Sequence, residues 1–129
     1  DLISKIVIKN KNIKIYKSLG WKNYLSCLHY VDMVIGNSSS AILEAPSYGI
    51  PSINIGDRQK GRVFSQSVIS VNPDHKKIIK AIKKGYSKNF QEKLLKITNP
   101  YGMPGASSKI ISILKKFQVS NNAKIFYDI

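Results

Sequence analysis

Apolar positions change their spacing several times along this chain, and the changes predict where helices and strands lie. Leu2, Ile3, Ile6 and Val7 recur at helical intervals, which predicts the end of a helix within residues 1–12. Short apolar runs further along predict strands. These predicted strands are residues 13–16, 32–35, 52–55 and 68–71.

Helical spacing returns between the predicted strands. A turn at residues 18–21 leads into a short helix whose apolar face is formed by Tyr24, Leu25, Leu28 and Val31. The next predicted helix, residues 40–48, contains Pro46, and proline costs about 3 kcal/mol inside a helix. We therefore expect this helix to begin near Ser40 and to bend. It should end at Gly49, where a glycine cap belongs.

The second half of the chain predicts three more helices. Asn72-Pro73-Asp74 is a stop-and-cap sequence, and Gly85 ends the helix that follows it. That helix has an apolar face made of Ile78, Ile79 and Ile82. A short helix at residues 89–97 and a loop at 99–105 come next.

The closing helix is predicted at residues 107–117. We expect it to turn three apolar residues inward, Ile110, Ile111 and Leu114. The residues up to 129 predict an added strand or an extended arm. Strands alternate with helices throughout, so the fold class is α/β with a parallel sheet.

The bulk composition indicates one modest domain. The chain has 129 residues, 43% of them hydrophobic. No apolar run approaches the roughly 20 residues that a membrane helix needs, and the N-terminus lacks the architecture of a signal peptide. Cys27 is the single cysteine, which excludes an intrachain disulfide and fits packing in a reducing, cytoplasmic protein.

The net charge of +14 has two explanations. A lysine-rich module could bind nucleic acid or an acidic surface. Alternatively, a lysine-rich composition simply covers solvated helix faces. The second explanation is preferred because no aromatic-basic interleaving or recognition motif accompanies the charge.

A serine triplet follows the strand predicted at residues 32–35. Ser38, Ser39 and Ser40 leave the backbone open to close approach, and their N–H and hydroxyl groups could donate to a diphosphate. An ordinary helix N-cap also uses serine, and the spacing favours neither interpretation. Glu44 lies one helical turn after Ser40, where a carboxylate could accept from the vicinal hydroxyls of a ribose. A solvated helix glutamate is the simpler alternative.

A basic loop at residues 56–62, with the sequence GDRQKGR, follows the strand predicted at residues 52–55. That strand should lie beside the one at residues 32–35, so the cations of the loop should face the same crevice as the serines. Arg58 suits bidentate pairing with phosphate, although a merely solvated loop is possible. Trp21 and Tyr24 could wall a base pocket or belong to the core.

Metal and nucleophile motifs are absent from the sequence. His29 and His75 have no further ligand at metal-binding spacing, so both are interpreted as surface histidines. There is no Walker loop, no GxGxxG sequence and no GxSxG elbow. Neither a metal site nor a cofactor is predicted.

Three segments resemble the UDP-N-acetylglucosamine 2-epimerase family, and within it the hydrolysing branch. Residues 36–62 read GNSSSAILEAPSYGIPSINIGDRQKGR, residues 99–117 read NPYGMPGASSKIISILKKF, and residues 126–129 read FYDI. The resemblance covers nearly the whole chain. One departure is Ala41, where the family usually has glycine, and a methyl group is tolerable there in a helix.

The resemblance implies a fold and a set of binding residues. The family has two Rossmann-like domains of glycosyltransferase-B type, and residues 1–129 match part of the C-terminal, UDP-binding domain, without its first strands. Ser38, Ser39 and Ser40 match the segment that grips the UDP phosphates. Other matching residues are Glu44 for the ribose hydroxyls, Arg58 for UDP, and Leu19 and Tyr24 for the uracil.

The resemblance also implies a reaction. UDP is eliminated across C1–C2 of UDP-N-acetylglucosamine, water adds to the glycal-like intermediate, and N-acetylmannosamine is released for sialic acid or related sugars. The family's catalytic acid and base groups lie outside the residues matched here. We therefore expect a piece of a longer enzyme that is inactive alone, needs an N-terminal domain and belongs to a homo-oligomer. No nucleic-acid or membrane partner is expected.

Two alternative functions come from other classes of protein. One is the lysine-rich module that binds nucleic acid or acidic surfaces. The other is a glycosyltransferase of the same architecture, which the DRQKGR sequence makes less suitable.

Overall fold

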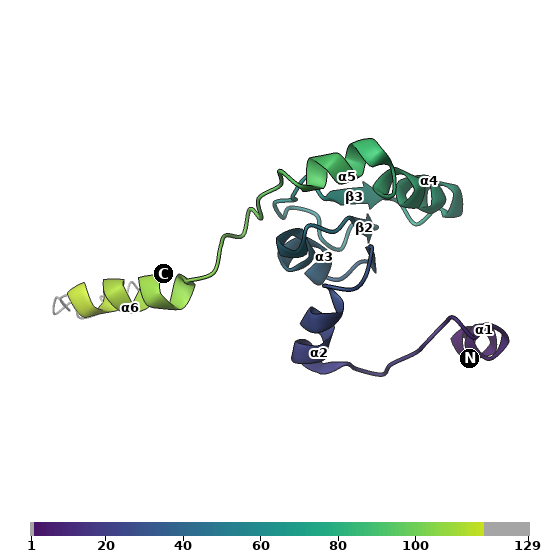
Figure 1. Cartoon of the computed structure of the whole chain (residues 1–129), viewed down its shortest axis with the longest axis horizontal. Coiled ribbons are helices and arrows are strands. Elements are labelled where there is room, and N and C mark those ends of the chain that lie inside the picture. Colours follow the sequence, from purple (N-terminus) through teal and green to yellow (C-terminus); the bar gives the residue numbers. More distant parts are fainter. Residues whose placement is uncertain (1, 118–129) are drawn as a thin grey trace, which may run out of the picture.

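The computed structural model describes residues 2–117, which build a parallel sheet with helices on both sides (Figure 1). Its strands are β1 (Val34–Gly36), β2 (Ser52–Ile55) and β3 (Val68–Val71). They are parallel and follow the order β1-β2-β3. The register pairs Ile35 with Ile53, and Ile53 with Ile69. The predicted α/β class with a parallel sheet is confirmed.

Seven helical segments accompany the sheet. They are α1 (Leu2–Lys9), α2 (Gly20–Cys27), α3 (Ser40–Leu43), the 3-10 helix η1 (Ala45–Tyr48), α4 (His75–Gly85), α5 (Lys88–Leu94) and α6 (Ala106–Lys116), all within the described residues. The predicted stop-and-cap sequence is confirmed, because the side chain of Asp74 accepts a hydrogen bond of 2.8 Å from the backbone N–H of Lys77.

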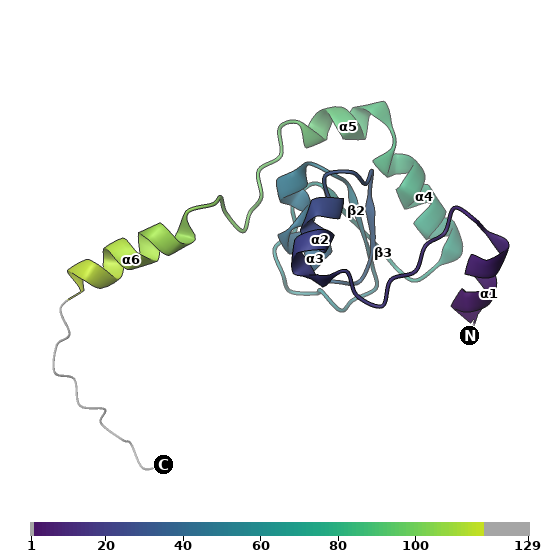
Figure 2. The same cartoon turned by 60° about the horizontal axis from the view of Figure 1, so that its bottom comes forward.

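The core lies on the central strand β2. Ile53 is fully buried, and its neighbours Ser52 and Asn54 are at most 2% exposed. Helix α3 contacts β1 and β2, whereas α4 contacts β2 and β3. The two helices lie on different sides of the strands (Figures 1 and 2). Because helices cover both faces of β2, the polar residues Ser52 and Asn54 are buried together with Ile53 although polar and apolar residues alternate along the strand.

The helix predicted at residues 40–48 does bend, as Pro46 indicates. Helix α3 stops at Leu43, and the chain continues as η1, whose second residue is Pro46. Proline has no N–H to continue the helical ladder, so the second segment tightens to 3-10 geometry. Gly49 then ends it in the left-handed region at φ 65°.

The predicted strand at residues 13–16 is wrong. These residues have no regular secondary structure and are all exposed. A strand needs a hydrogen-bonded neighbour, and no described strand pairs with this segment. The strand predicted at residues 32–35 is displaced, since β1 begins at Val34.

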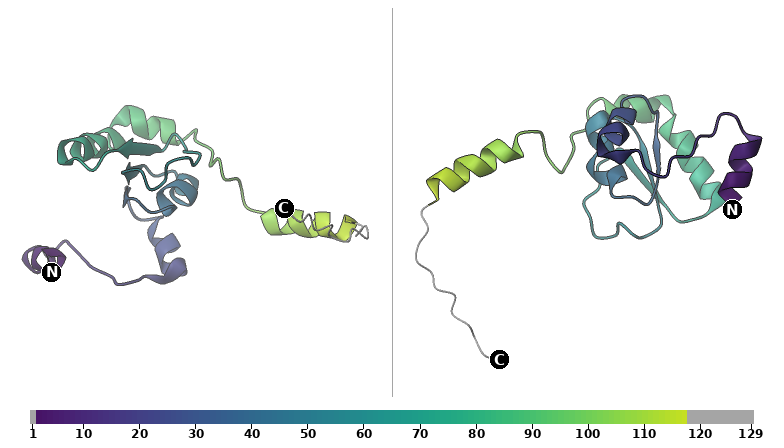
Figure 3. Two further views of the ribbon diagram at one scale, coloured as in Figure 1. Left: turned by 180° about the vertical axis from the view of Figure 1, so that it is seen from behind. Right: turned by 90° about the horizontal axis from the view of Figure 1, so that it is seen from below.

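The prediction for the closing helix is half right. Helix α6 exists, but Ile110, Ile111 and Leu114 are 55%, 51% and 65% exposed rather than turned inward. Figures 1 and 3 show α6 standing away from the sheet, with α1 at the opposite end of the molecule. Helical periodicity identified an apolar face but could not say what covers it. The predicted arm at residues 118–129 lies outside the described residues.

The capping contact of α4 generates a stability prediction. Replacing Asp74 with alanine removes the acceptor for the Lys77 N–H, and loss of such a cap costs about 1 kcal/mol. Asp74→Ala should therefore lower the free energy of unfolding in urea by about that amount. Lys76→Ala, an exposed position of the same helix, should leave it nearly unchanged. Equal stability of Asp74→Ala and the wild type would contradict the contact.

Candidate functional site

The serine turn (residues 38–40) joins the carboxyl end of β1 to helix α3. The backbone N–H groups of Ser38 and Ser39 make no hydrogen bond within the residues that the structure describes. Both serine carbonyls, in contrast, accept bonds from the first turn of α3. Because α3 is a single turn of four residues, its dipole is small, and the free N–H groups matter more than the helix dipole. The turn can therefore donate at least two backbone hydrogen bonds to an anion.

The three serine hydroxyls have different surroundings. Ser40 is buried, and its hydroxyl forms a hydrogen bond with the Tyr24 hydroxyl. Ser38 Oγ accepts a bond of 3.3 Å from the Ser40 N–H. Ser39 is half-buried and its hydroxyl makes no capping bond. The hydroxyl of Ser39 is thus available to a ligand, and the exposed hydroxyl of Ser38, which only accepts in its bond to Ser40, keeps its O–H free to donate.

A cavity of about 520 Å³ adjoins the serine turn through Tyr24. Its lining includes Leu19 and Tyr24, the two residues that the resemblance assigns to the uracil. Trp21, predicted either to wall a base pocket or to belong to the core, also lines it and is 71% exposed, so its placement in the core is wrong. The cavity is completed by Tyr16, Ser18 and Gly20. An open, aromatic-lined hollow of this kind suits a planar ring next to an anion site.

Glu44 lies at the junction of α3 and η1. Its backbone N–H donates to the Ser40 carbonyl at 3.1 Å, so it is one turn from the serine turn. The side chain is half-buried, and its Oε2 is buried without a hydrogen-bond partner among the described residues. A buried carboxylate oxygen without a donor is unusual, and a ligand hydroxyl would satisfy it.

The cationic loop (residues 56–62) lies against the serine turn. The side-chain amide of Gln59 donates a hydrogen bond of 2.7 Å to the carbonyl of Asn37, the residue before Ser38. Gln59 is only 3% exposed. The loop and the turn, which are 22 residues apart at this contact, are therefore adjacent, as the order of the strands predicted.

Arg58 is exposed and precedes Gln59 in the cationic loop. Among the described residues the one ion pair joins Lys88 and Glu92 on α5, so Arg58 is not neutralised by a carboxylate. Its guanidinium is free for an anionic ligand. Gln59, by contrast, was not singled out in the sequence, because no local pattern identifies a bond across 22 residues.

Two residues of the segment at 99–105 form hydrogen bonds to the segments that carry Glu44 and the end of the cationic loop. Asn99 donates to the Leu43 carbonyl at 2.8 Å and to Ser47 Oγ at 2.7 Å, on either side of Glu44. The Tyr101 hydroxyl donates to the Val63 carbonyl at 3.0 Å, just beyond the cationic loop. In the sequence, Asn99 and Tyr101 stand out only as part of the segment at residues 99–117 that carries the family resemblance. Their contacts give them a structural role.

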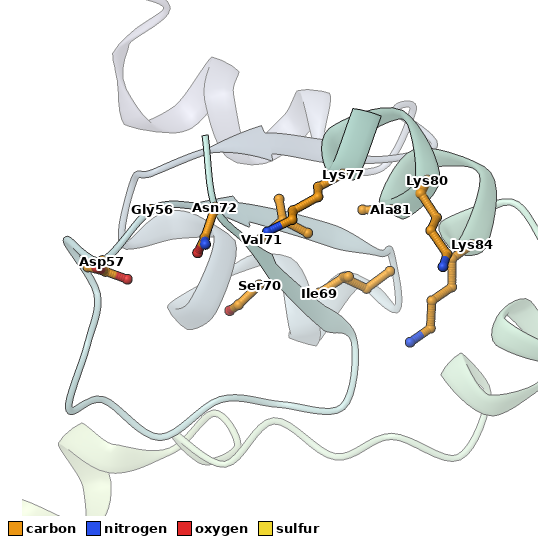
Figure 4. Close-up of a pocket in the computed structure, with 10 residues that line it drawn as sticks. All are labelled: Gly56, Asp57, Ile69, Ser70, Val71, Asn72, Lys77, Lys80, Ala81 and Lys84. Carbon is orange, nitrogen blue, oxygen red and sulfur yellow. The ribbon is translucent and has the colours of Figure 1, made fainter. Parts of the chain in front are cut away.

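A second cavity, of about 390 Å³, adjoins the start of the cationic loop at Gly56 and Asp57 (Figure 4). It is formed between β3 and α4, and Lys77, Lys80 and Lys84 extend along it from the helix. None of the predicted site residues lines it. Strand β3 is an edge of the sheet, and lysines beside an edge strand discourage pairing with other chains.

The predicted surface histidines are confirmed as exposed. His29 packs edge-to-face on Tyr48, with ring centroids 4.7 Å apart, and His75 is in the first turn of α4. Within residues 2–117 no group of three metal-ligating side chains converges. No helix in that range is both long and apolar enough to cross a membrane.

The sequence is similar to several longer bacterial proteins. It is 37% identical over 127 residues to the Polysialic acid biosynthesis protein P7 of Escherichia coli, covering 97% of this chain and 32% of that protein. It is 40% identical over 93 residues to the GDP/UDP-N,N'-diacetylbacillosamine 2-epimerase (hydrolyzing) of Campylobacter jejuni, covering 71% of this chain and 24% of that protein. The chain thus spans a third or less of the length of these relatives.

The fold has a counterpart among solved structures. A crystal structure of a candidate UDP-N-acetylglucosamine 2-epimerase from Listeria monocytogenes superposes with a TM-score of 0.74 and 18% sequence identity, covering 89% of this chain and 33% of that one. A similarity at this identity shows the fold alone.

The family to which the chain belongs is shown by a match to a family sequence model. The model of the family described as UDP-N-acetylglucosamine 2-epimerase matches residues 1–115, which include the serine turn, Glu44 and the cationic loop. The resemblance of residues 36–62 and 99–117 is thereby confirmed. The chain belongs to the UDP-N-acetylglucosamine 2-epimerase family.

Proposed function

We propose that this chain is the UDP-binding part of a hydrolysing UDP-N-acetylglucosamine 2-epimerase. In the proposed complex, the diphosphate lies between the serine turn and Arg58. Glu44 accepts hydrogen bonds from the ribose hydroxyls, and the cavity at Leu19 and Tyr24 takes the uracil. A hydrolysing enzyme is favoured because the relative from Campylobacter jejuni carries that description.

One observation carries the proposal. The hydrogen bond from Gln59 to the Asn37 carbonyl brings the cationic loop to the serine turn. Free N–H groups and the loop that carries Arg58 then border the same edge of the sheet. In open α/β folds, ligands bind at the carboxyl ends of the strands, where these two segments begin.

The proposed reaction converts UDP-N-acetylglucosamine and water into N-acetylmannosamine and UDP. The C1–O bond to UDP breaks as the C2 proton leaves, and water then adds across the resulting double bond. Negative charge develops on the departing diphosphate. The donors of the serine turn and Arg58 would stabilise that charge without reorganisation, as pre-oriented donors do at other developing anions.

The remaining parts of the enzyme belong to the same proposal. The groups that move protons at C2 come from outside this chain, in an N-terminal domain, and the assembled enzyme is a homo-oligomer. Its product feeds sialic acid or related surface-sugar synthesis, in line with the name of the Escherichia coli relative. A cytoplasmic location fits the free, half-buried thiol of Cys27.

Removing the proposed phosphate donors should weaken UDP binding. Hydrogen bonds to charged groups are worth about 1.5–3 kcal/mol, so Arg58→Ala should raise the Kd for UDP about 10- to 100-fold. Ser39→Ala should raise it about three- to tenfold. Titration calorimetry on the whole chain measures both values. The control variants are Lys93→Ala on α5 and Ser107→Ala on α6, both exposed and expected to bind normally.

A different outcome would support the alternative function. If the phosphate variants bind UDP as the wild type does, the proposed site is wrong. Retention of the chain on DNA that falls steeply with salt, with Lys77, Lys80 and Lys84 responsible, would instead indicate a nucleic-acid module.

Glu44 can be tested through the ribose. Glu44→Gln replaces an acceptor by a donor at one carboxyl oxygen, and it should weaken UDP binding about tenfold. The nucleotide 2′-deoxy-UDP lacks one of the two ribose hydroxyls, so part of the interaction with Glu44 is already missing. Glu44→Gln should therefore weaken the binding of 2′-deoxy-UDP less than it weakens the binding of UDP. Glu92→Gln, at the exposed ion pair on α5, is the matched control. If Glu44→Gln lowered the affinity for UDP and for 2′-deoxy-UDP by the same factor, the proposed contacts between Glu44 and the ribose hydroxyls would be contradicted.

The chain alone should be inactive. Because the proton-transferring groups are proposed to lie elsewhere, the 129 residues should release no N-acetylmannosamine from UDP-N-acetylglucosamine above background. Chromatographic detection of the sugar after long incubation checks this. Turnover by the chain itself would mean that it contains the catalytic groups.

A further inference from the structure

We infer that Gln59 is a positioning residue that holds Arg58 against the serine turn, an inference that rests on the proposed function. Gln59 does not contact the ligand in this account. It acts through its hydrogen bond to Asn37 and through the backbone turn that it shares with Arg58. The consequence is that UDP affinity depends on an amide that makes no contact with UDP.

The position of Gln59 differs from that of every neighbour in its loop. It is 3% exposed, whereas Asp57, Arg58 and Lys60 are all exposed. It is the only buried residue between residues 56 and 64. Its amide nitrogen lies 2.7 Å from the Asn37 carbonyl oxygen. The loop is therefore fixed to the body of the protein at this one side chain along its middle.

The backbone of the loop transmits this anchoring to Arg58. The Lys60 N–H donates to the Asp57 carbonyl at 2.9 Å, which makes Arg58 and Gln59 the two central residues of one tight turn. The two ends of the loop are also held. Gly56 donates to the Val71 carbonyl at 2.8 Å, and the Val63 carbonyl accepts from Tyr101. With both ends fixed, the Gln59 contact determines the direction in which the turn, and hence Arg58, faces.

Gln59 also has an unsatisfied atom. Its Oε1 is buried without a hydrogen-bond partner in the part of the chain that the structure describes. A buried acceptor without a partner is unfavourable for stability. A leucine or methionine at this position would fill the same space and would have no such acceptor. Glutamine at this position is therefore better explained by the donor it supplies to Asn37 than by stability.

The benefit of this anchoring is pre-organisation. An arginine on an unrestrained surface loop loses loop and side-chain freedom when it binds a phosphate, and that loss weakens affinity. A loop already held beside the serine turn avoids most of it. Since UDP leaves as charge builds on its diphosphate, a pre-placed cation also serves the reaction.

A double-mutant cycle on the whole chain tests the inference. UDP affinity is measured for the wild type, Gln59→Leu, Arg58→Ala and the double variant, together with uridine affinity, which needs no phosphate contact. Gln59→Leu should weaken UDP binding about tenfold while uridine binding stays unchanged. In the Arg58→Ala background the same substitution should have little further effect, because the residues act together.

The matched control is another glutamine that bonds to a backbone carbonyl. Gln91 on α5 donates to the carbonyl of Gly85, the last residue of α4, at 2.6 Å, and neither residue belongs to the proposed site, so Gln91→Leu should leave binding of UDP and uridine unchanged. Equal losses for both ligands in Gln59→Leu would indicate a general structural role and overturn the inference. Full additivity of the Gln59 and Arg58 effects would also overturn it.

A second variant covers the case in which Gln59→Leu does not fold. In Gln59→Glu the ionised carboxylate cannot donate to Asn37, but the protonated carboxyl can. The ratio of UDP to uridine affinity, relative to the wild type at the same pH, should therefore recover as the pH is lowered. A ratio that does not change with pH would contradict the inference. If the wild-type chain does not bind UDP at all, the proposed function is wrong. If it binds UDP but the Gln59 variants behave as the wild type does, only the inference about Gln59 is wrong.

Discussion

The parallel pairing of β1 with β2 is the constraint on which the site depends. Parallel strands end at the same edge of a sheet, so the segments that follow Gly36 and Ile55 must begin side by side. One of these segments is the serine turn and the other is the cationic loop. The hydrogen bond between Gln59 and Asn37 closes the gap between them. An antiparallel pairing would have placed the two segments at opposite ends of the strands.

The site combines groups that are satisfied with groups that are not. Tyr24 and Ser40 bond to each other, which links the aromatic cavity to the serine turn. Glu44 and Gln59 each keep a buried oxygen without a partner among the described residues. Ser52 and Asn54 on β2 also keep such an atom, so it is the place of Glu44 and Gln59 beside the serine turn, and not the missing partner alone, that connects them with the site. Both residues flank the place where the diphosphate and ribose are proposed to lie.

Local sequence signals predicted much of the fold. The strand at residues 52–55, the strand at 68–71 and the cap at Asp74 were all predicted correctly, because each is specified by its own residues and their neighbours. The expectations that failed depend on distant partners. Residues 13–16 lack a strand to pair with in the described structure, and nothing there covers the apolar face of α6. The spacing of apolar residues indicates that one face of a helix is apolar, but it does not identify the segment that packs on that face.

The candidate site shows the same division. The serine triplet, Glu44 and Arg58 stood out by residue type and by their place after strands, and the structure places the serine turn beside the loop that carries Arg58. Two features could not be found in the sequence. One is the bond that occupies the Ser40 hydroxyl, made by a residue 16 positions away. The other is Gln59, whose partner is 22 positions away.

The most direct test is a crystal structure of this chain with UDP. The account predicts that the diphosphate contacts the backbone N–H groups of Ser38 and Ser39 on one side and the Arg58 guanidinium on the other. A diphosphate bound in the cavity beside Lys77, Lys80 and Lys84, with Arg58 turned to solvent, would contradict it.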